Sequence, residues 1–344
     1  MRSGGGADAP PGSPGRPPLI ELVPAPGGGW AVDARRLPRP HRPRWGVAAA
    51  LFAATLATTT TLGAVWGLWT RTDAVTDAVP LLTPDTVAAV WSDPALVALG
   101  FSFSLPALAI LLCHELGHYL ACRRYRLPAT PPFFLPAPFG VGTLGAFIRI
   151  RAPIRSKREL FDVGIWGPIA GFAALLPFLL IGVARSTPAP LEPAGLEQAA
   201  GILYLPGDCL AVRLATAWFH GPLPDGFVLD LHPFALAAWF GLLATAINLL
   251  PLGQLDGGHV LYAATGRLQR RLALPLWLAL GGAGLVWSGW WLWCAIVLLM
   301  GLYHPPVSDE SEPLGPGRRA LAWVALAILV LSFMPVPLRE VLVR

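Results

Sequence analysis

The chain has 344 residues, of which 54% are hydrophobic and 13% are charged, and its mean hydropathy is +0.57. Soluble domains carry about 25% charged residues, so this composition excludes an ordinary soluble protein and indicates a membrane protein. The net charge of +5 does not indicate nucleic-acid binding, because the basic residues cluster in short loops beside apolar segments.

The first 44 residues are rich in Gly, Pro and Arg and show no periodicity. Such a composition buries too little apolar surface to fold, so we expect a disordered tail over residues 1–44. We expect one membrane domain to occupy residues 45–344.

Long apolar segments predict the membrane-spanning helices, since ~20 apolar residues suffice to cross a bilayer. The stretch 271–303 is too long for one span, and Ser288-Gly289 is expected to divide it into two short helices. The fold class is therefore an all-α, multi-pass membrane protein with about seven spans, or six as the alternative. The predicted spans are residues 45–69, 94–122, 160–184, 233–252, the divided stretch 271–303, and 319–335. Residues 185–232 are expected to form a longer polar connection.

The second span contains the sequence His114-Glu115-Leu116-Gly117-His118 directly after the uncharged residues 105–113. Helical residues four apart share a face, so His114 and His118 can bind one metal ion. Glu115 then lies beside the metal, where it can take a proton from water. Ionisable groups in a membrane helix are costly and indicate a functional site. The pattern predicts zinc-dependent hydrolysis within a bilayer.

Eight basic residues lie between positions 123 and 158, whereas the neighbouring connections on the other side contain few. The positive-inside rule places this loop in the cytoplasm, together with the basic N-terminal tail. His114 precedes Arg123 by about nine residues, or ~13 Å of helix, so the site is expected near the cytoplasmic side.

Within this loop, Ile148 and Ile150 alternate with Arg149 and Arg151, which predicts a strand with two different faces. The glycines at 140, 142 and 145 are expected to turn a small β-hairpin at the cytoplasmic face. Two interpretations remain open. The hairpin presents an exposed strand edge to unfolded substrate, or it only seals the cytoplasmic face.

A catalytic zinc ion needs three protein ligands and one open position. The segment 248–259 ends the fourth span at the same expected depth as His114, and Asp256 is the candidate third ligand. His259 is an alternative ligand or an outer partner of the site. The remaining histidines stand beside Arg, Gly or Pro and are interpreted as surface residues: His41, His220, His232 and His304.

Two paired motifs carry a family resemblance. The sequence His-Glu-Leu-Gly-His at 114–118, with Asn248–Gly258 ending in Leu-Asp-Gly-Gly, resembles the site-2 protease family of intramembrane zinc metalloproteases. The run Gly167–Gly171 also matches, and its two glycines predict close helix packing. Further stretches resemble the branch of the plastid "ethylene-dependent gravitropism-deficient and yellow-green" proteases and their bacterial relatives: Phe133–Pro136, Gly142–Phe147 and Pro251–Asp256.

The resemblance covers roughly residues 95–340 and implies a role for each matching residue. His114, His118 and Asp256 would bind Zn²⁺, Glu115 would activate the water, and Asn248 would hold the substrate backbone or its oxyanion. The intramembrane metalloprotease domain would then occupy 45–344, with its catalytic core at about 94–270.

The resemblance also implies that the substrate is a transmembrane segment of another protein, met within the lipid bilayer. We expect a bacterial plasma membrane, with the active site toward the cytoplasm. The alternatives are a non-proteolytic membrane protein that binds or transports zinc through the same ligands, and an inactive relative that has kept these residues.

Overall fold

The computed structural model describes residues 22–24, 30–32, 44–69, 81–191 and 201–343. The chain separates into two compact units, Met1–Pro43 and Arg44–Arg344. In the first unit, β1 (Leu22–Pro24) and β2 (Trp30–Val32) pair as antiparallel strands. The predicted disordered tail otherwise lies outside the described residues.

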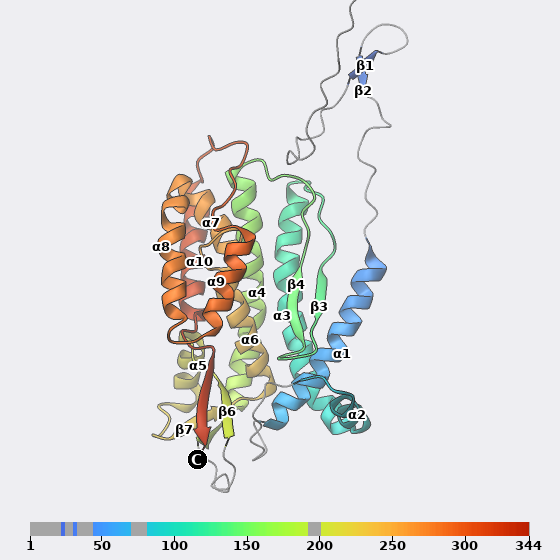
Figure 1. The fold of residues 1–344 in the computed structure, drawn as a ribbon, viewed down its shortest axis with the longest axis vertical. Coiled ribbons are helices and arrows are strands. Elements are labelled where there is room, and N and C mark those ends of the chain that lie inside the picture. The colour runs from blue at the N-terminus through green and yellow to red at the C-terminus, as the bar shows by residue number, and fades with distance from the viewer. Residues whose placement is uncertain (1–21, 25–29, 33–43, 70–80, 192–200, 344) are drawn as a thin grey trace, which may run out of the picture. The chain divides into compact units, whose positions relative to one another are not determined.

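Helices make up most of the second unit (Figure 1). They are α1 (Trp45–Trp69), α2 (Pro84–Ser92), α3 (Pro94–Arg124), α4 (Lys157–Arg185), α5 (Leu210–His220), α6 (Pro233–Asn248), α7 (Asp256–Thr265), α8 (Arg267–Ala283), α9 (Gly289–Met300) and α10 (Pro316–Ser332). The strands are β3 (Phe133–Pro136), β4 (Thr143–Phe147), β5 (Thr187–Pro190), β6 (Gly201–Pro206), β7 (Phe227–Asp230) and β8 (Leu338–Val343). They form the antiparallel pairs β3–β4, β5–β7 and β6–β8.

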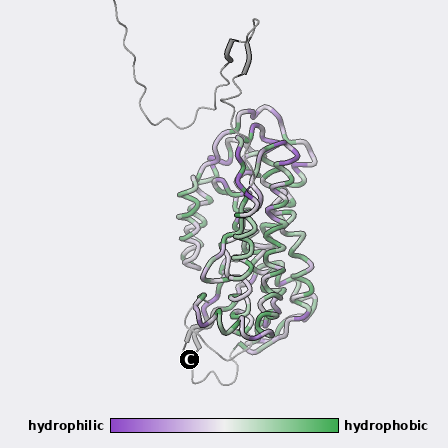
Figure 2. Tube along the Cα trace, turned by 90° about the vertical axis from the view of Figure 1, so that its right-hand side faces the viewer, coloured by the Kyte–Doolittle hydropathy of each residue, from purple (hydrophilic) through white to green (hydrophobic). Residues whose placement is uncertain are grey.

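The apolar character of the helices agrees with a membrane protein. Among the described residues, α1, α3 and α4 are long and apolar enough to cross a membrane, and α6 and α9 are apolar but shorter. Figure 2 shows apolar residues along the helices and hydrophilic residues where the helices connect. The mostly helical class is confirmed, whereas helix length and apolarity alone do not establish seven spans.

The predicted span boundaries agree well with the helices. The first span coincides with α1, the second begins at Pro94 as α3 does, and α9 begins at Gly289. The long apolar stretch is therefore divided as predicted, because residues 284–288 leave the helical path between α8 and α9.

The helices α3, α4 and α6 pack together around a buried apolar core. Phe103 and Ile110 of α3, Leu175 and Leu179 of α4 and Leu242 of α6 are each at most 2% exposed. Gly117 lets α3 approach α4 closely, because a Cβ atom there would overlap the carbonyl oxygen of Trp166. Close backbone approach through small residues is the usual way that membrane helices associate.

The connection 185–232 has more structure than predicted. It contains α5, β5, β6 and β7. The helix α5 has only 11 residues and is amphipathic, so a search for long apolar spans overlooks it. The strand β6 pairs with β8 at the far end of the sequence, and local pattern does not predict such a partner.

The predicted hairpin is present, although its second strand lies earlier than expected. The strands β3 and β4 pair with Phe133 opposite Phe147. Gly140 and Gly142 have positive φ angles in the turn between them. Residues 148–151 lie outside β4, and only Ile150 forms an isolated bridge, with Ala129. The Ile/Arg alternation therefore follows the hairpin and does not form its strand.

A polar network joins three helices at the end of the unit where α3 ends. The Tyr125 hydroxyl donates to Asp162 Oδ2 at 2.5 Å. Arg318 of α10 donates to both carboxylate oxygens of Asp162, from Nε at 2.8 Å and from Nη2 at 2.7 Å. This bidentate pair ties α10 to α4 directly beside the last turn of α3.

Replacing this arginine should destabilise the helix bundle. We expect Arg318→Gln to lower the free energy of unfolding by about 2 kcal/mol, because charge-assisted hydrogen bonds to a half-buried carboxylate are lost. The control Arg158→Gln removes an ion pair with Glu312 in which both side chains are more than 40% exposed, and it should change little. Unfolding in detergent, followed by circular dichroism, measures both. Equal losses in the two variants would contradict the assigned importance of the Asp162 pair.

Candidate metal centre

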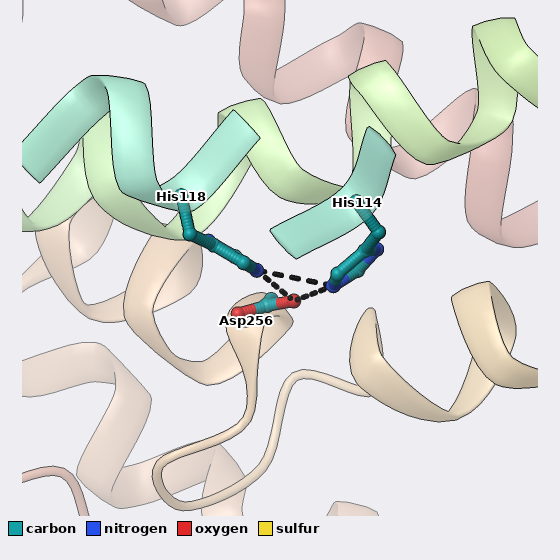
Figure 3. A group of neighbouring side chains, drawn as sticks. All are labelled: His114, His118 and Asp256. Carbon is teal, nitrogen blue, oxygen red and sulfur yellow. Dashed lines mark hydrogen bonds and ion pairs between the residues drawn. The ribbon is translucent and has the colours of Figure 1, made fainter. Parts of the chain in front are cut away.

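The two histidines of the α3 motif point to the same side of the helix, as Figure 3 shows. They are one helical turn apart and both are buried. Their Nε2 atoms lie 3.0 Å from each other. Nδ1 of His118 donates a hydrogen bond to the carbonyl oxygen of Val163 at 2.6 Å, because a carbonyl can only accept. This bond places the proton on Nδ1 and leaves the lone pair of Nε2 directed toward His114.

Asp256, the first residue of α7, meets this histidine pair. Its Oδ2 atom lies 3.3 Å from Nε2 of His114 and 3.3 Å from Nε2 of His118. The possible ligand atoms of the three residues all lie within 4.8 Å of one another. The structure therefore brings together the three residues that the sequence predicted, although Asp256 is far from the histidines in sequence.

This group of donors fits zinc. Two imidazole nitrogens and one carboxylate oxygen are a usual set of protein ligands for a catalytic zinc ion, with a fourth position left open. The bond from His118 to Val163 is the kind of outer partner that fixes the tautomer and orientation of a zinc-bound histidine. Among the residues that the structure describes, His114, His118 and Asp256 form a group that could hold a metal ion.

The helix α4 provides the space that the histidines occupy. A Cβ atom at Gly167 would overlap the imidazole of His118, and one at Gly171 would lie 3.1 Å from Cβ of His114. The predicted close packing at these two glycines is therefore present. It also serves the candidate site, because any larger residue at Gly167 would displace the His118 ring.

Glu115 lies on α3 next to His114, and its side chain is buried in the same region. Its carboxylate is hydrogen bonded to the backbone of Ile148, the residue that follows β4, and it interacts electrostatically with His118 and Asp256. A carboxylate in this position is near the metal group without belonging to it. The hairpin end and the histidine motif are thus in direct contact.

Asn248, the last residue of α6, also lies at the site. Its Nδ2 atom is 3.5 Å from Nε2 of His114. The side-chain amide is therefore beside the candidate metal group.

His259 is not part of the metal group. Its Nδ1 atom lies 2.8 Å from Nε2 of His304. The interpretation of His304 as a surface residue is wrong, because its side chain is only 3% exposed. Its neighbour Pro305 suggested an open loop, but this loop folds back over α7, a tertiary contact that has no local sequence signal. His41 lies outside the described residues.

Comparisons with known proteins agree with this geometry. Residues 102–276 match the model of peptidase family M50. The probable zinc metalloprotease EGY2, chloroplastic, of Oryza sativa subsp. indica is 30% identical over 257 residues, which cover 74% of this chain and 46% of the relative. The probable zinc metalloprotease EGY1, chloroplastic, of Arabidopsis thaliana is 30% identical over 236 residues, which cover 67% and 42%. The chain thus spans less than half the length of these relatives.

Removing the carboxylate should weaken metal binding. We expect the purified wild type to hold about one zinc ion per chain and Asp256→Ala to lose more affinity than the ~10–100-fold that the loss of an outer partner costs. Asp208→Ala, which removes an exposed carboxylate paired with Arg339, is the control and should retain zinc. Elemental analysis and chelator competition measure the effect. A wild type that takes up no zinc, even from added metal, would contradict the site.

The two glycines of α4 should differ in their effect on zinc. Gly167→Ala should weaken zinc binding strongly, because the new methyl group would occupy the position of the His118 ring. Gly171→Ala adds a methyl group 3.1 Å from His114 Cβ, a contact that a small shift relieves, so its effect should be smaller. Chelator competition on both variants tests this order. The reverse order would show that α4 does not define the space of the histidines.

Proposed function

The chain belongs to peptidase family M50, and on this basis we propose that it is an intramembrane zinc metalloendopeptidase that cleaves peptide bonds in or near transmembrane segments of membrane proteins. The observation that carries the proposal is the convergence of His114, His118 and Asp256, with Glu115 beside them, on a helix apolar enough to cross a membrane. Its relatives are named zinc metalloproteases, and its own metalloprotease chemistry follows from its family.

Each residue has a distinct role in the proposed reaction. His114, His118 and Asp256 would hold zinc, which would supply Lewis-acid chemistry toward the scissile carbonyl and the attacking water. Glu115 takes the proton from the water as it attacks and passes it to the leaving amine. The backbone of Ile148 interacts with the Glu115 carboxylate and can help to orient it for both transfers.

Asn248 is proposed to bind the substrate. Its amide lies beside His114, so a donor from Nδ2 can reach a peptide carbonyl presented to the zinc. A fixed donor at the oxygen that gains charge during attack stabilises the transition state more than the ground state.

The hairpin β3–β4 is proposed to align the substrate. The strand β4 pairs with β3 on one edge, and its residues Leu144 and Phe147 are 64% and 44% exposed. A substrate segment must be extended before its peptide bond becomes accessible, and an open strand edge can pair with such a segment. The contact between Ile148 and Glu115 supports this interpretation over a purely sealing hairpin, because the strand leads directly to the proposed base.

The proposed arrangement in the membrane has seven spans, formed by α1, α3, α4, α6, α8, α9 and α10. The domain covers 45–344 and the catalytic core about 94–270. The basic loops support a site toward the cytoplasmic side of the membrane. The relatives are named chloroplastic, so the expectation of a bacterial plasma membrane gains no support from them.

Removing the proposed base should stop the reaction and leave the metal site intact. Glu115→Gln is expected to lower the cleavage rate of a transmembrane reporter in proteoliposomes by ~10²-fold or more. Its zinc content should stay at the wild-type level, since Glu115 is not a ligand. Glu312→Gln, at an exposed ion pair, is the control and should cleave normally. Undiminished cleavage by Glu115→Gln would refute its role as the base.

A further inference from the structure

The segment that begins at the last residue of α9, residues 300–310, passes over the turn that precedes Asp256. We call residues 300–310 the clamp segment. The backbone N–H of Gly253 donates to the carbonyl oxygen of Leu302 at 3.2 Å, and Nε2 of Gln254 donates to that of Met300 at 2.8 Å. Gly253 has a φ of +51°, and a Cβ atom there would overlap the carbonyl oxygen of Gly301. The turn just before Asp256 is therefore shaped to lie directly against the clamp segment.

The clamp segment also holds the helix that begins with Asp256. His304 contacts His259 at 2.8 Å and stacks on the ring of Tyr262, with ring centroids 4.5 Å apart and planes inclined by 23°. The Tyr262 hydroxyl donates to Oε1 of Glu310 at 2.5 Å. The clamp segment thus contacts the turn before α7 at positions 253 and 254, and α7 itself at positions 259 and 262.

The hydrogen bonds of His304 form an ordered chain. The carbonyl oxygen of Pro305 lies 2.6 Å from Nδ1 of His304 and can only accept, so the proton of the ring sits on Nδ1. Nε2 of His304 is then an acceptor, and His259 donates to it from Nδ1. Burial lowers the pKa of His304, which favours this neutral form. One carbonyl in the clamp segment thus fixes the orientation of a histidine on α7.

The start of α7 also rests on α4. A Cβ atom at Gly164 would lie 2.7 Å from Cβ of His259 and 3.2 Å from the carbonyl oxygen of Asp256. The start of α7 is therefore held between α4 and the clamp segment. Zinc–ligand distances tolerate only about 0.2 Å, so the position of this short helix decides whether the Asp256 carboxylate can complete the site.

We propose that the clamp segment, acting mainly through His304, positions Asp256 for zinc binding. This inference rests on the proposed zinc-hydrolase function. His304 is a positioning residue, since it reaches the site only through His259, Tyr262 and the helix that they share with Asp256. The clamp segment lies outside residues 102–276, the part that matches the family model.

The test measures zinc alone, without any substrate. The variant His304→Phe keeps a ring that can stack on Tyr262 and removes the acceptor for His259. The variant Gln254→Leu removes the bond to Met300, and because Gln254 is exposed, this change does not put folding at risk. We expect chelator competition to show that each full-length variant binds zinc roughly 10-fold more weakly than the wild type. This is the lower end of the loss in metal affinity that follows when a partner of a metal ligand is removed. The visible spectrum of the Co²⁺-loaded protein should change as well. His304→Gln, whose amide oxygen can accept from His259, should recover part of the affinity.

The matched control is His220→Phe. His220 is half-buried, whereas His304 is buried, and its Nε2 likewise contacts a neighbouring acceptor, the carbonyl oxygen of Val183 at 2.7 Å. This carbonyl lies near the other end of α4 from Gly164. Its zinc affinity and Co²⁺ spectrum should equal those of the wild type. A positioning role is overturned if His304→Phe and Gln254→Leu bind zinc as tightly as the wild type, even if their unfolding temperature falls. If the wild type still binds zinc in that case, the proposed function stands. A wild type without zinc affinity would overturn both the positioning role and the proposed function.

Discussion

A carboxylate and two imidazoles lie together among apolar helices. The rest of the structure depends on keeping their charges and hydrogen-bonding atoms paired. Removing a charged group from water costs several kcal/mol unless its partners are close and well oriented. Asp256 meets this condition through His114 and His118, each with Nε2 3.3 Å away. The contact between α3 and α4, the turn before α7 and the clamp segment each hold one part of this group in place.

The ligands differ in how they are held. His114 and His118 belong to the same long helix, so helical geometry alone fixes their spacing, and the glycines of α4 leave room for their rings. Asp256 begins a helix of ten residues, too short to be stable by itself. Its position depends on neighbouring elements, which makes it the adjustable part of the site. The hairpin adds a further contact, since the backbone of Ile148, the residue after β4, interacts with the Glu115 carboxylate.

The sequence predicted the features that are encoded locally. The bounds of α1 follow from an apolar run, the histidine spacing follows from the helical repeat, and the division before Gly289 follows from a helix-breaking pair. The features that it did not predict arise from contacts between distant segments. His304 is buried because its loop folds over α7, and β6 finds its partner in β8 near the C-terminal end. Asp256 was identified because its segment ends the fourth span at the expected depth of His114 and carries a recognisable motif, whereas the residues that hold it have no such signal.

The order of the clamp segment along the chain has a consequence for biogenesis. The histidines, Glu115 and Asp256 are all synthesised before residues 300–310, which hold the helix of Asp256. At about 5–20 residues per second, the ribosome needs roughly 3–10 s to pass from Asp256 to Glu310. During that interval the nascent chain has all the candidate site residues but lacks the segment that we propose aligns Asp256. A chain built in this order would complete its candidate metal site only after the clamp segment has been synthesised and has folded against α7.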